Sequence, residues 1–222
     1  STTYFVNKEL PGLRVIKYDR ESREKLSGIT FSIWRDSEYL GDYETDGSGE
    51  ILLTDCQPGT YRVEEKQSDD EHITVTTPQE VELEAGDGIK ELVFFNDKKP
   101  GIHLTKVDSA DLSKPIANAK FLFEAVDGSW SQELTTLADG TIDLSKLPTG
   151  AVVVTELECP GYVIDDAQRI IHLDPNEDAE FVFTNSKLPT LTLTKTSSDG
   201  SPLAGVSFRL AKIEDDGHYL DR

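Results

Sequence analysis

Residues 13–19 read Leu-Arg-Val-Ile-Lys-Tyr-Asp, and in a β-strand every second residue of this stretch lies on the same face. Leu13, Val15 and Lys17 then point the same way, so an ammonium group follows two apolar side chains into a core. Burying an ammonium group without a partner is costly. The stretch therefore predicts a strand and, for Lys17, a specific partner inside the fold.

The same arrangement recurs along the chain at an interval of 89 residues. Alternating apolar residues precede a lysine each time, and a second alternating stretch ends in an asparagine at the same interval. Because burying such groups is costly, a chain that repeats a buried ammonium group and a buried amide is expected to have a structural or chemical role for them. The lysines are Lys17, Lys106 and Lys195, and the asparagines are Asn7, Asn96 and Asn185.

This repeat predicts the domain organisation better than chain length does. We expect residues 1–9 to be the last strand of an upstream repeat and residues 10–99 to form repeat one. Residues 100–188 would form repeat two, and residues 189–222 would be an incomplete third repeat. The links between repeats are short and contain proline, which predicts modules in series with restricted bending.

Short alternating stretches separated by glycine and proline turns predict an all-β fold. About seven strands in roughly 90 residues are typical of an antiparallel β-sandwich, so the fold class is tandem β-sandwich domains. The strands expected in repeat one are Leu13–Tyr18, Ile29–Trp34, Ile51–Leu53, Thr60–Glu65, His72–Thr77, Glu80–Glu84 and Ile89–Asn96.

Composition excludes several classes of partner. The net charge of −20 argues against nucleic acid and anionic membranes, and no apolar run approaches the thickness of a bilayer. No signal peptide is visible. Cys56 and Cys159 stand at non-equivalent positions of the two repeats, which predicts free thiols rather than a disulfide framework. Nothing in the pattern calls for a cofactor or a metal.

A third polar residue completes the pattern in each full repeat. Glu65 and Glu156 each end an alternating stretch that begins at a glycine, at Gly59 and Gly150. Amine, amide and carboxyl groups from three strands are thus expected to meet in one core, where desolvation disfavours charge. A neutral amine beside a carboxamide is a nucleophile facing an acyl group. The acid could donate a proton to the amide oxygen and then carry protons to the departing ammonia.

These motifs resemble a known family. The motifs of repeat one are Leu13-x-Val15-x-Lys17-x-Asp19, Gly28-Ile29-Thr30-Phe31, Gly59-Thr60-Tyr61-x-Val63-x-Glu65 and Phe94-Phe95-Asn96. The motifs of repeat two are Leu104-x-Lys106-x-Asp108, Glu156 with Pro160-Gly161-Tyr162, and Phe183-Thr184-Asn185. The third copy begins with Leu193-x-Lys195. Together they are similar to the collagen-adhesin B-type (Cna-B-like, prealbumin-like) repeats of Gram-positive surface adhesins and pilins.

The resemblance implies one intramolecular isopeptide bond in each full repeat. Lys17 would join Asn96 with help from Glu65, and Lys106 would join Asn185 with help from Glu156. Asn7 and Lys195 would be halves of incomplete neighbours. Repeat one departs from the family pattern, because the polar stretch 68–71 stands where repeat two has Pro-Gly-Tyr. Either Glu64 or Glu65 could be the inward-facing acid of repeat one, and alternation with Val63 favours Glu65.

The expected function is that of a stalk segment in an extracellular, cell-wall-anchored protein of a Gram-positive bacterium, with no catalytic turnover. Its partners would be neighbouring repeats and, through other domains, a host protein or glycan. A host-binding adhesin module, an accessory domain of a secreted enzyme and a sortase-polymerised shaft subunit are the alternatives. Several further motifs are interpreted as structural: the turn Leu147-Pro148-Thr149-Gly150, the solvated acids Asp69–His72, and the packing residues Trp34 and Trp130.

Overall fold

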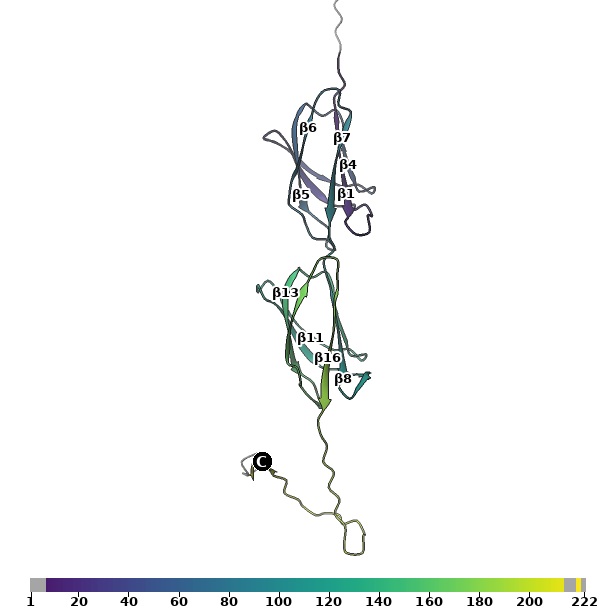
Figure 1. The fold of residues 1–222 in the computed structure, drawn as a ribbon, viewed down its shortest axis with the longest axis vertical. Helices are drawn as coiled ribbons and strands as arrows, with labels where there is room; N and C mark the ends of the chain where they lie inside the picture. The colour runs from purple at the N-terminus through teal and green to yellow at the C-terminus, as the bar shows by residue number, and fades with distance from the viewer. Residues whose placement is uncertain (1–6, 214–218, 221–222) are drawn as a thin grey trace, which may run out of the picture. The chain divides into compact units, whose positions relative to one another are not determined.

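The chain folds as two β-sandwiches in tandem, as the sequence predicts (Figure 1). The structure is a computed structural model and describes residues 7–213 and 219–220. Its described residues contain strands, turns and loops but no helix, and therefore no helix that could cross a membrane.

Repeat one consists of a three-stranded sheet, β4-β1-β7, that faces a four-stranded sheet, β3-β2-β5-β6. Glycine and proline turns close the short strands, so each strand ends where the alternation ends. The strands are β1 (Gly12–Asp19), β2 (Thr30–Arg35), β3 (Glu38–Glu44), β4 (Glu50–Leu53), β5 (Gly59–Gln67), β6 (Gln79–Leu83) and β7 (Ile89–Asn96).

Repeat two has the same order of strands, with two short additions. Its sheets are β12-β8-β16-β14, with β9 paired to β8, and β11-β10-β13-β15. The strands are β8 (Ile102–Asp108), β9 (Asp111–Pro115), β10 (Lys120–Ala125), β11 (Ser131–Thr135), β12 (Thr141–Leu144), β13 (Gly150–Glu158), β14 (Tyr162–Val163), β15 (Gln168–Leu173) and β16 (Ala179–Lys187).

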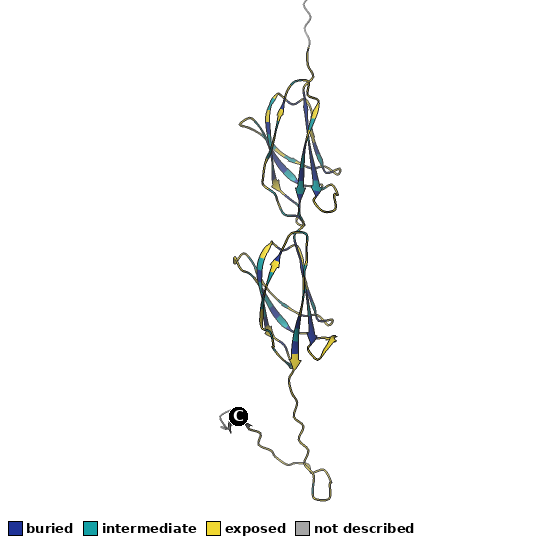
Figure 2. Cartoon of the chain, viewed as in Figure 1, coloured by how far each residue is buried: buried dark blue, intermediate teal, exposed yellow. Residues whose placement is uncertain are grey.

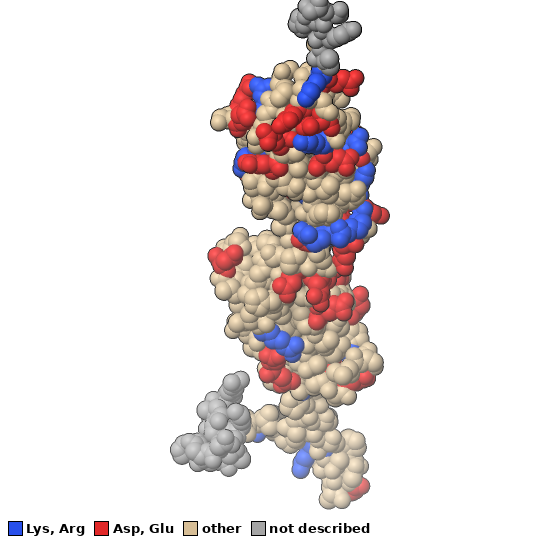
Figure 3. Space-filling model, turned by 45° about the horizontal axis from the view of Figure 1, so that its top comes forward, with Lys and Arg blue, Asp and Glu red and all other residues tan. Residues whose placement is uncertain are grey.

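Each sandwich buries its apolar side chains between its two sheets. Buried residues accordingly lie along the strands of both sandwiches (Figure 2). Alternation along the strands produces this core, because every second side chain points inward. Acidic side chains lie on the outer surface of both sandwiches (Figure 3). The core of repeat one includes Leu13, Val15, Phe31, Val63 and Phe94, and the core of repeat two includes Leu104, Phe121, Phe123, Val154 and Phe183.

The first and last strands of each repeat pair in parallel, whereas the other strand pairs are antiparallel. In the β1–β7 pair, Lys17 lies opposite Phe94 and Asp19 lies opposite Asn96. Lys17 and Asn96 are therefore diagonal neighbours on the inward face, within reach of a long side chain. The pair β8–β16 repeats this register, with Lys106 opposite Phe183 and Asp108 opposite Asn185.

The strand expected at His72–Thr77 is wrong, since this stretch forms no named strand. Its backbone turns because the amide of His72 donates to the Asp69 side chain, and the histidine ring points inward. Strand β3 is not among the strands expected from the sequence. Its residues are half-buried or exposed, so they show no alternation of apolar and polar residues. An edge strand that packs little against the core leaves little pattern in the sequence.

The segments outside the two sandwiches are described in part. Of the strand expected at residues 1–9, residues 1–6 lie outside the described residues, and Asn7 is exposed and in no strand. Residues 188–222 form a separate unit, of which 214–218 and 221–222 lie outside the description. Its described strands are β17 (Lys212–Ile213) and β18 (Tyr219–Leu220), and Leu191, Leu193, Leu203, Val206 and Phe208 are exposed in it.

Candidate functional site

The core of repeat one contains a lysine, a glutamate and an asparagine in mutual contact. Lys17 Nζ donates to Glu65 Oε2 at 2.8 Å and to Asn96 Oδ1 at 2.5 Å. Asn96 Nδ2 donates to the other oxygen of the same carboxyl group, Glu65 Oε1, at 2.6 Å. All three side chains are 0% exposed. One carboxyl group thus bridges the amine nitrogen and the amide nitrogen.

Repeat two brings the equivalent residues together around Glu156. Lys106 Nζ donates to Glu156 Oε2 at 3.1 Å, and Asn185 Nδ2 donates to Glu156 Oε1 at 2.7 Å. The three residues are at most 3% exposed. The carboxamide is oriented differently, because Asn185 Oδ1 accepts from the backbone amide of Asp165 at 3.4 Å.

Three strands supply each trio, and their register explains why the groups meet. Lys17 and Asn96 come from neighbouring parallel strands of one sheet, while Glu65 comes from β5 of the facing sheet, where it lies opposite Phe31. The ring of Phe31 also lies 5.9 Å from Lys17 Nζ and covers the ammonium group. The amine is therefore held between a carboxyl group, an amide and an aromatic face.

Burial changes the chemistry of both lysines. Desolvation lowers the pKa of Lys17 and of Lys106 from the ordinary value, although the neighbouring Glu65 and Glu156 act in the opposite direction. A lower pKa increases the neutral fraction of the amine, which is the nucleophilic form. Burial thus favours the neutral form of each lysine more than solvent exposure would.

The carboxyl group faces a different atom from the one that the sequence argument gave it. Glu65 contacts the amide nitrogen of Asn96, whereas Asn96 Oδ1 is occupied by Lys17. The carboxyl group therefore lies between the lysine nitrogen and the amide nitrogen, and contacts both. Proton transfer between these two nitrogens through one carboxyl group needs no movement of the backbone.

The aspartate that follows each lysine by two residues has a side-chain partner that sequence reasoning missed, buried in repeat one and half-buried in repeat two. Asp19 Oδ2 lies 2.9 Å from His72 Nε2, and Asp108 Oδ2 accepts from the Tyr162 hydroxyl at 3.2 Å. The replacement of Pro-Gly-Tyr in repeat one is thus compensated by His72. The spacing from Glu65 to His72 is one residue longer than that from Glu156 to Tyr162, so alignment by spacing alone does not reveal the substitution.

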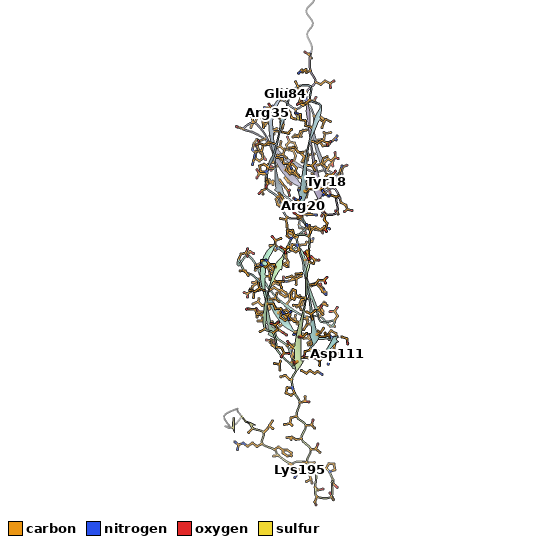
Figure 4. All side chains as sticks on the ribbon, in the orientation of Figure 1. Tyr18, Arg20, Arg35, Glu84, Asp111 and Lys195 are labelled. Atoms are coloured by element: carbon orange, nitrogen blue, oxygen red, sulfur yellow. The ribbon has the colours of Figure 1, made fainter. Side chains whose placement is uncertain are left out.

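The remaining candidate residues take no part in the hydrogen bonds within the two trios. Asn7 is exposed, and so is Lys195, which lies on the unit 188–222 (Figure 4). Cys56 and Cys159 are free and buried. The ring of Trp34 packs 5.5 Å from the ring of Tyr39.

Two further motifs are structural as well. The stretch 147–150 links β12 to β13, and Trp130 packs against the core of repeat two. Among the described residues, no group of histidine, cysteine and acidic side chains is arranged to hold a metal ion.

Comparison with solved structures finds resemblances of low sequence identity. The Bacillus anthracis TIE protein is 22% identical, with a TM-score of 0.43 over 81% of this chain and 34% of that one. A streptococcal ancillary pilin is 19% identical, with a TM-score of 0.46 over 83% of this chain and 64% of that one. The shaft pilin SpaA from Lactobacillus rhamnosus GG is 12% identical, with a TM-score of 0.46 over 84% of this chain and 100% of that one. The chain thus spans about a third of the first of these proteins and under two thirds of the second.

The comparison with protein families is more specific. No curated protein matches the chain. The family model for the SpaA prealbumin-like fold domain matches residues 11–98 and, a second time, residues 100–187. Each match contains one complete trio of lysine, glutamate and asparagine. The chain therefore belongs to the family of SpaA prealbumin-like fold domains, of which it carries two tandem copies.

Proposed function

We propose that this chain is a structural stalk segment of a cell-surface adhesin or pilus-like protein, and that each full repeat closes its own Lys–Asn isopeptide bond. Membership of a pilin-type domain family supports a structural, non-enzymatic role. The single observation that carries the covalent part is the buried carboxyl group of Glu65, which bridges the two nitrogens that must exchange a proton. Glu156 has the same arrangement in repeat two.

The reaction balances without a cofactor or a second substrate. The neutral amine of Lys17 attacks Cγ of Asn96, so that a bond from Nζ to Cγ forms and the bond from Cγ to Nδ2 breaks. The proton released by Nζ passes to Glu65 Oε2, and a proton from the same carboxyl group reaches Nδ2 through Oε1. Ammonia leaves, and the product is an amide that joins β1 to β7. Contact between buried groups supplies the effective concentration that this reaction lacks in water.

The surrounding features fit a load-bearing segment on the outside of a Gram-positive cell wall. An acidic surface keeps serial modules soluble and apart. The proposal includes residues 189–222 as the beginning of a third repeat, because the apolar side chains exposed there would be buried by the remaining strands of a complete sandwich. Host proteins or glycans would be bound by other parts of such a protein.

Intact mass measurement of the purified chain tests the proposal directly. We expect a mass lower than that of the sequence by two ammonia molecules, one for each repeat. Glu156→Gln should restore the mass of one ammonia and leave the bond in repeat one intact. Glu158→Gln is the matched control, because this exposed glutamate lies two residues further along the same strand. An unmodified mass of the folded chain would refute the covalent proposal.

A second measurement tests the consequence for stability. Each bond closes a loop between residues 79 apart in sequence. By the loop-entropy model used for disulfides, such a link contributes about 4–5 kcal/mol to the free energy of unfolding. Asn96→Ala should therefore lower the denaturant midpoint of repeat one and leave that of repeat two unchanged, as followed by hydrogen exchange of each repeat.

A further inference from the structure

A bulge follows the central glutamate in both repeats and changes which residue points inward next. Glu65 pairs with Phe31, but the next paired residue of β5 is Gln67, opposite Thr30, so Lys66 is the extra residue. Strict alternation after Glu65 would bury Gln67. The bulge exposes Gln67 and turns Ser68 into the core, where it is 7% exposed.

The same bulge occurs in repeat two. Glu156 pairs with Phe121, and Glu158 pairs with Lys120, which leaves Leu157 as the extra residue. Cys159 is then the residue that turns inward, and it is 7% exposed. Two repeats of different sequence thus share a local distortion beside the same functional glutamate.

In repeat one, Ser68 contacts the nitrogen that the proposed reaction expels. Asn96 Nδ2 donates to Ser68 Oγ at 2.9 Å and to Glu65 Oε1 at 2.6 Å. Both amide hydrogens are therefore engaged, while the amide oxygen accepts from Lys17. A flipped carboxamide would place its oxygen against the Glu65 carboxyl group, so Ser68 and Glu65 together fix the orientation of the reacting group.

In repeat two, a thiol occupies the position of that hydroxyl group. Burial raises the pKa of Cys159, while the nearby Asn185 side chain lowers this pKa and Glu156 raises it. A neutral thiol is a weak hydrogen-bond acceptor compared with a hydroxyl group. A weaker hydrogen bond from the Asn185 amide to the thiol is consistent with the different orientation of this amide, whose Oδ1 accepts from the backbone amide of Asp165 rather than from Lys106.

We propose that the residue after the bulged strand is a catalytic group that holds the leaving nitrogen, and that Ser68 makes repeat one close its bond faster than Cys159 allows in repeat two. The inference rests on the proposed isopeptide function. Ser68 Oγ accepts an N–H bond throughout and neither gains nor loses a proton. It keeps Nδ2 against Glu65 while the bond from Cγ to Nδ2 breaks.

Pulse-labelled cell-free synthesis of the full chain gives the rates. Samples quenched in denaturant at increasing times are digested, and mass spectrometry counts the cross-linked and linear peptides of each repeat. Ser68→Ala should slow repeat one roughly fivefold, the loss expected for one neutral hydrogen bond, without affecting repeat two. Cys159→Ser should accelerate repeat two by a similar factor, and Ser68→Cys should slow repeat one toward the rate of repeat two.

Two controls separate this role from packing and from the parent proposal. In an Asn96→Ala background, adding Ser68→Ala should leave the melting temperature unchanged, since no reacting amide remains. If Ser68→Ala lowers the melting temperature of this background as much as it lowers that of the wild type, Ser68 is a packing residue and the inference is overturned. Unchanged rates in Ser68→Ala and Cys159→Ser, with normal cross-linking, would overturn this inference alone. Wild-type chain that folds and never cross-links would refute the proposed function and this inference with it.

Discussion

Asp19 shows how one residue links the stability of repeat one to pH. Burial disfavours its charge, but the backbone amide of Ser22 and the side chain of His72 outweigh this effect and lower the pKa of Asp19 from 3.8 to about 2. His72 is buried and also faces Asp69, with Nδ1 2.7 Å from Asp69 Oδ1. The ionised carboxylate is thus part of a buried polar cluster beside Lys17.

This lowered pKa predicts a loss of stability in acid. A group whose pKa is depressed by folding stabilises the protein above its unfolded pKa, and the contribution disappears as pH falls through the folded value. For Asp19 the loss runs from about pH 4 to about pH 2 and amounts to on the order of 2 kcal/mol. Urea unfolding at pH 5 and at pH 2.5, followed by hydrogen exchange in repeat one, measures it.

Asp19→Asn is the control for this pH dependence. The variant lacks the titrating group, so its stability in repeat one should change less over this pH interval than that of the wild type. Equal pH slopes in the two proteins would show that other groups cause the acid sensitivity.

At the scale of the strand and its turns, two glycines hold the backbone of the two buried lysines. The carbonyl oxygen of Gly140 accepts from the Lys106 amide at 2.8 Å, and that of Gly49 accepts from the Lys17 amide at 3.0 Å. Both glycines have positive φ, 77° for Gly140 and 68° for Gly49. At Gly140 the turn and strand β8 approach each other with no room for a side chain, whereas a side chain at Gly49 would meet Lys25 and Leu26.

Gly140→Ala should disturb this contact and impair the bond in repeat two. A Cβ at this position would lie 2.5 Å from the Lys106 carbonyl oxygen and 2.9 Å from Pro115 Cβ, so β8 would have to shift. The variant adds the strain of an alanine at positive φ, about 1 kcal/mol or more. We expect a lower melting temperature and a lower cross-linked fraction in repeat two, measured by peptide mass spectrometry.

Gly128→Ala separates the clash from the backbone strain. Gly128 also has positive φ, 73°, but a Cβ there would meet no heavy atom within 4 Å. This variant should lose about 1 kcal/mol of stability and cross-link normally. If Gly140→Ala behaves like Gly128→Ala, the close approach to Lys106 has no role in positioning the lysine.

The strands also explain what the sequence could and could not predict. Alternation that ends in Lys17, Glu65 and Asn96 was enough to predict their burial, because period-two patterns identify the inward face directly. The bulge after Glu65 was not predictable, since it breaks that period and transfers the inward position from Gln67 to Ser68. The contact of His72 with Asp19 depends on a loop of different length in each repeat, which alternation does not describe.

At the scale of a whole repeat, the parallel pairing of β1 and β7 decides where tension would travel. A chain pulled from both sides of repeat one enters at the start of β1 and leaves at the end of β7. Lys17 lies near the end of β1, and Asn96 is the last residue of β7. A covalent bond between them would carry the load from the first strand directly to the exit, so the residues between them would bear no tension.

Force spectroscopy on the chain, held at its two ends, tests this path. Without the bond, unfolding of repeat one would release the 79-residue separation between Lys17 and Asn96, or roughly 270 Å of extended chain. With the bond, that length stays hidden at any force below rupture of a covalent link. We expect wild-type chains to show no such step from either repeat, and Asn96→Ala to restore one step, with Asn185→Ala restoring the equivalent step in repeat two. A step of full length in wild-type chains that carry both mass deficits would mean that load reaches the interior of the repeats by another route, and the load-bearing interpretation would fail although the bonds exist.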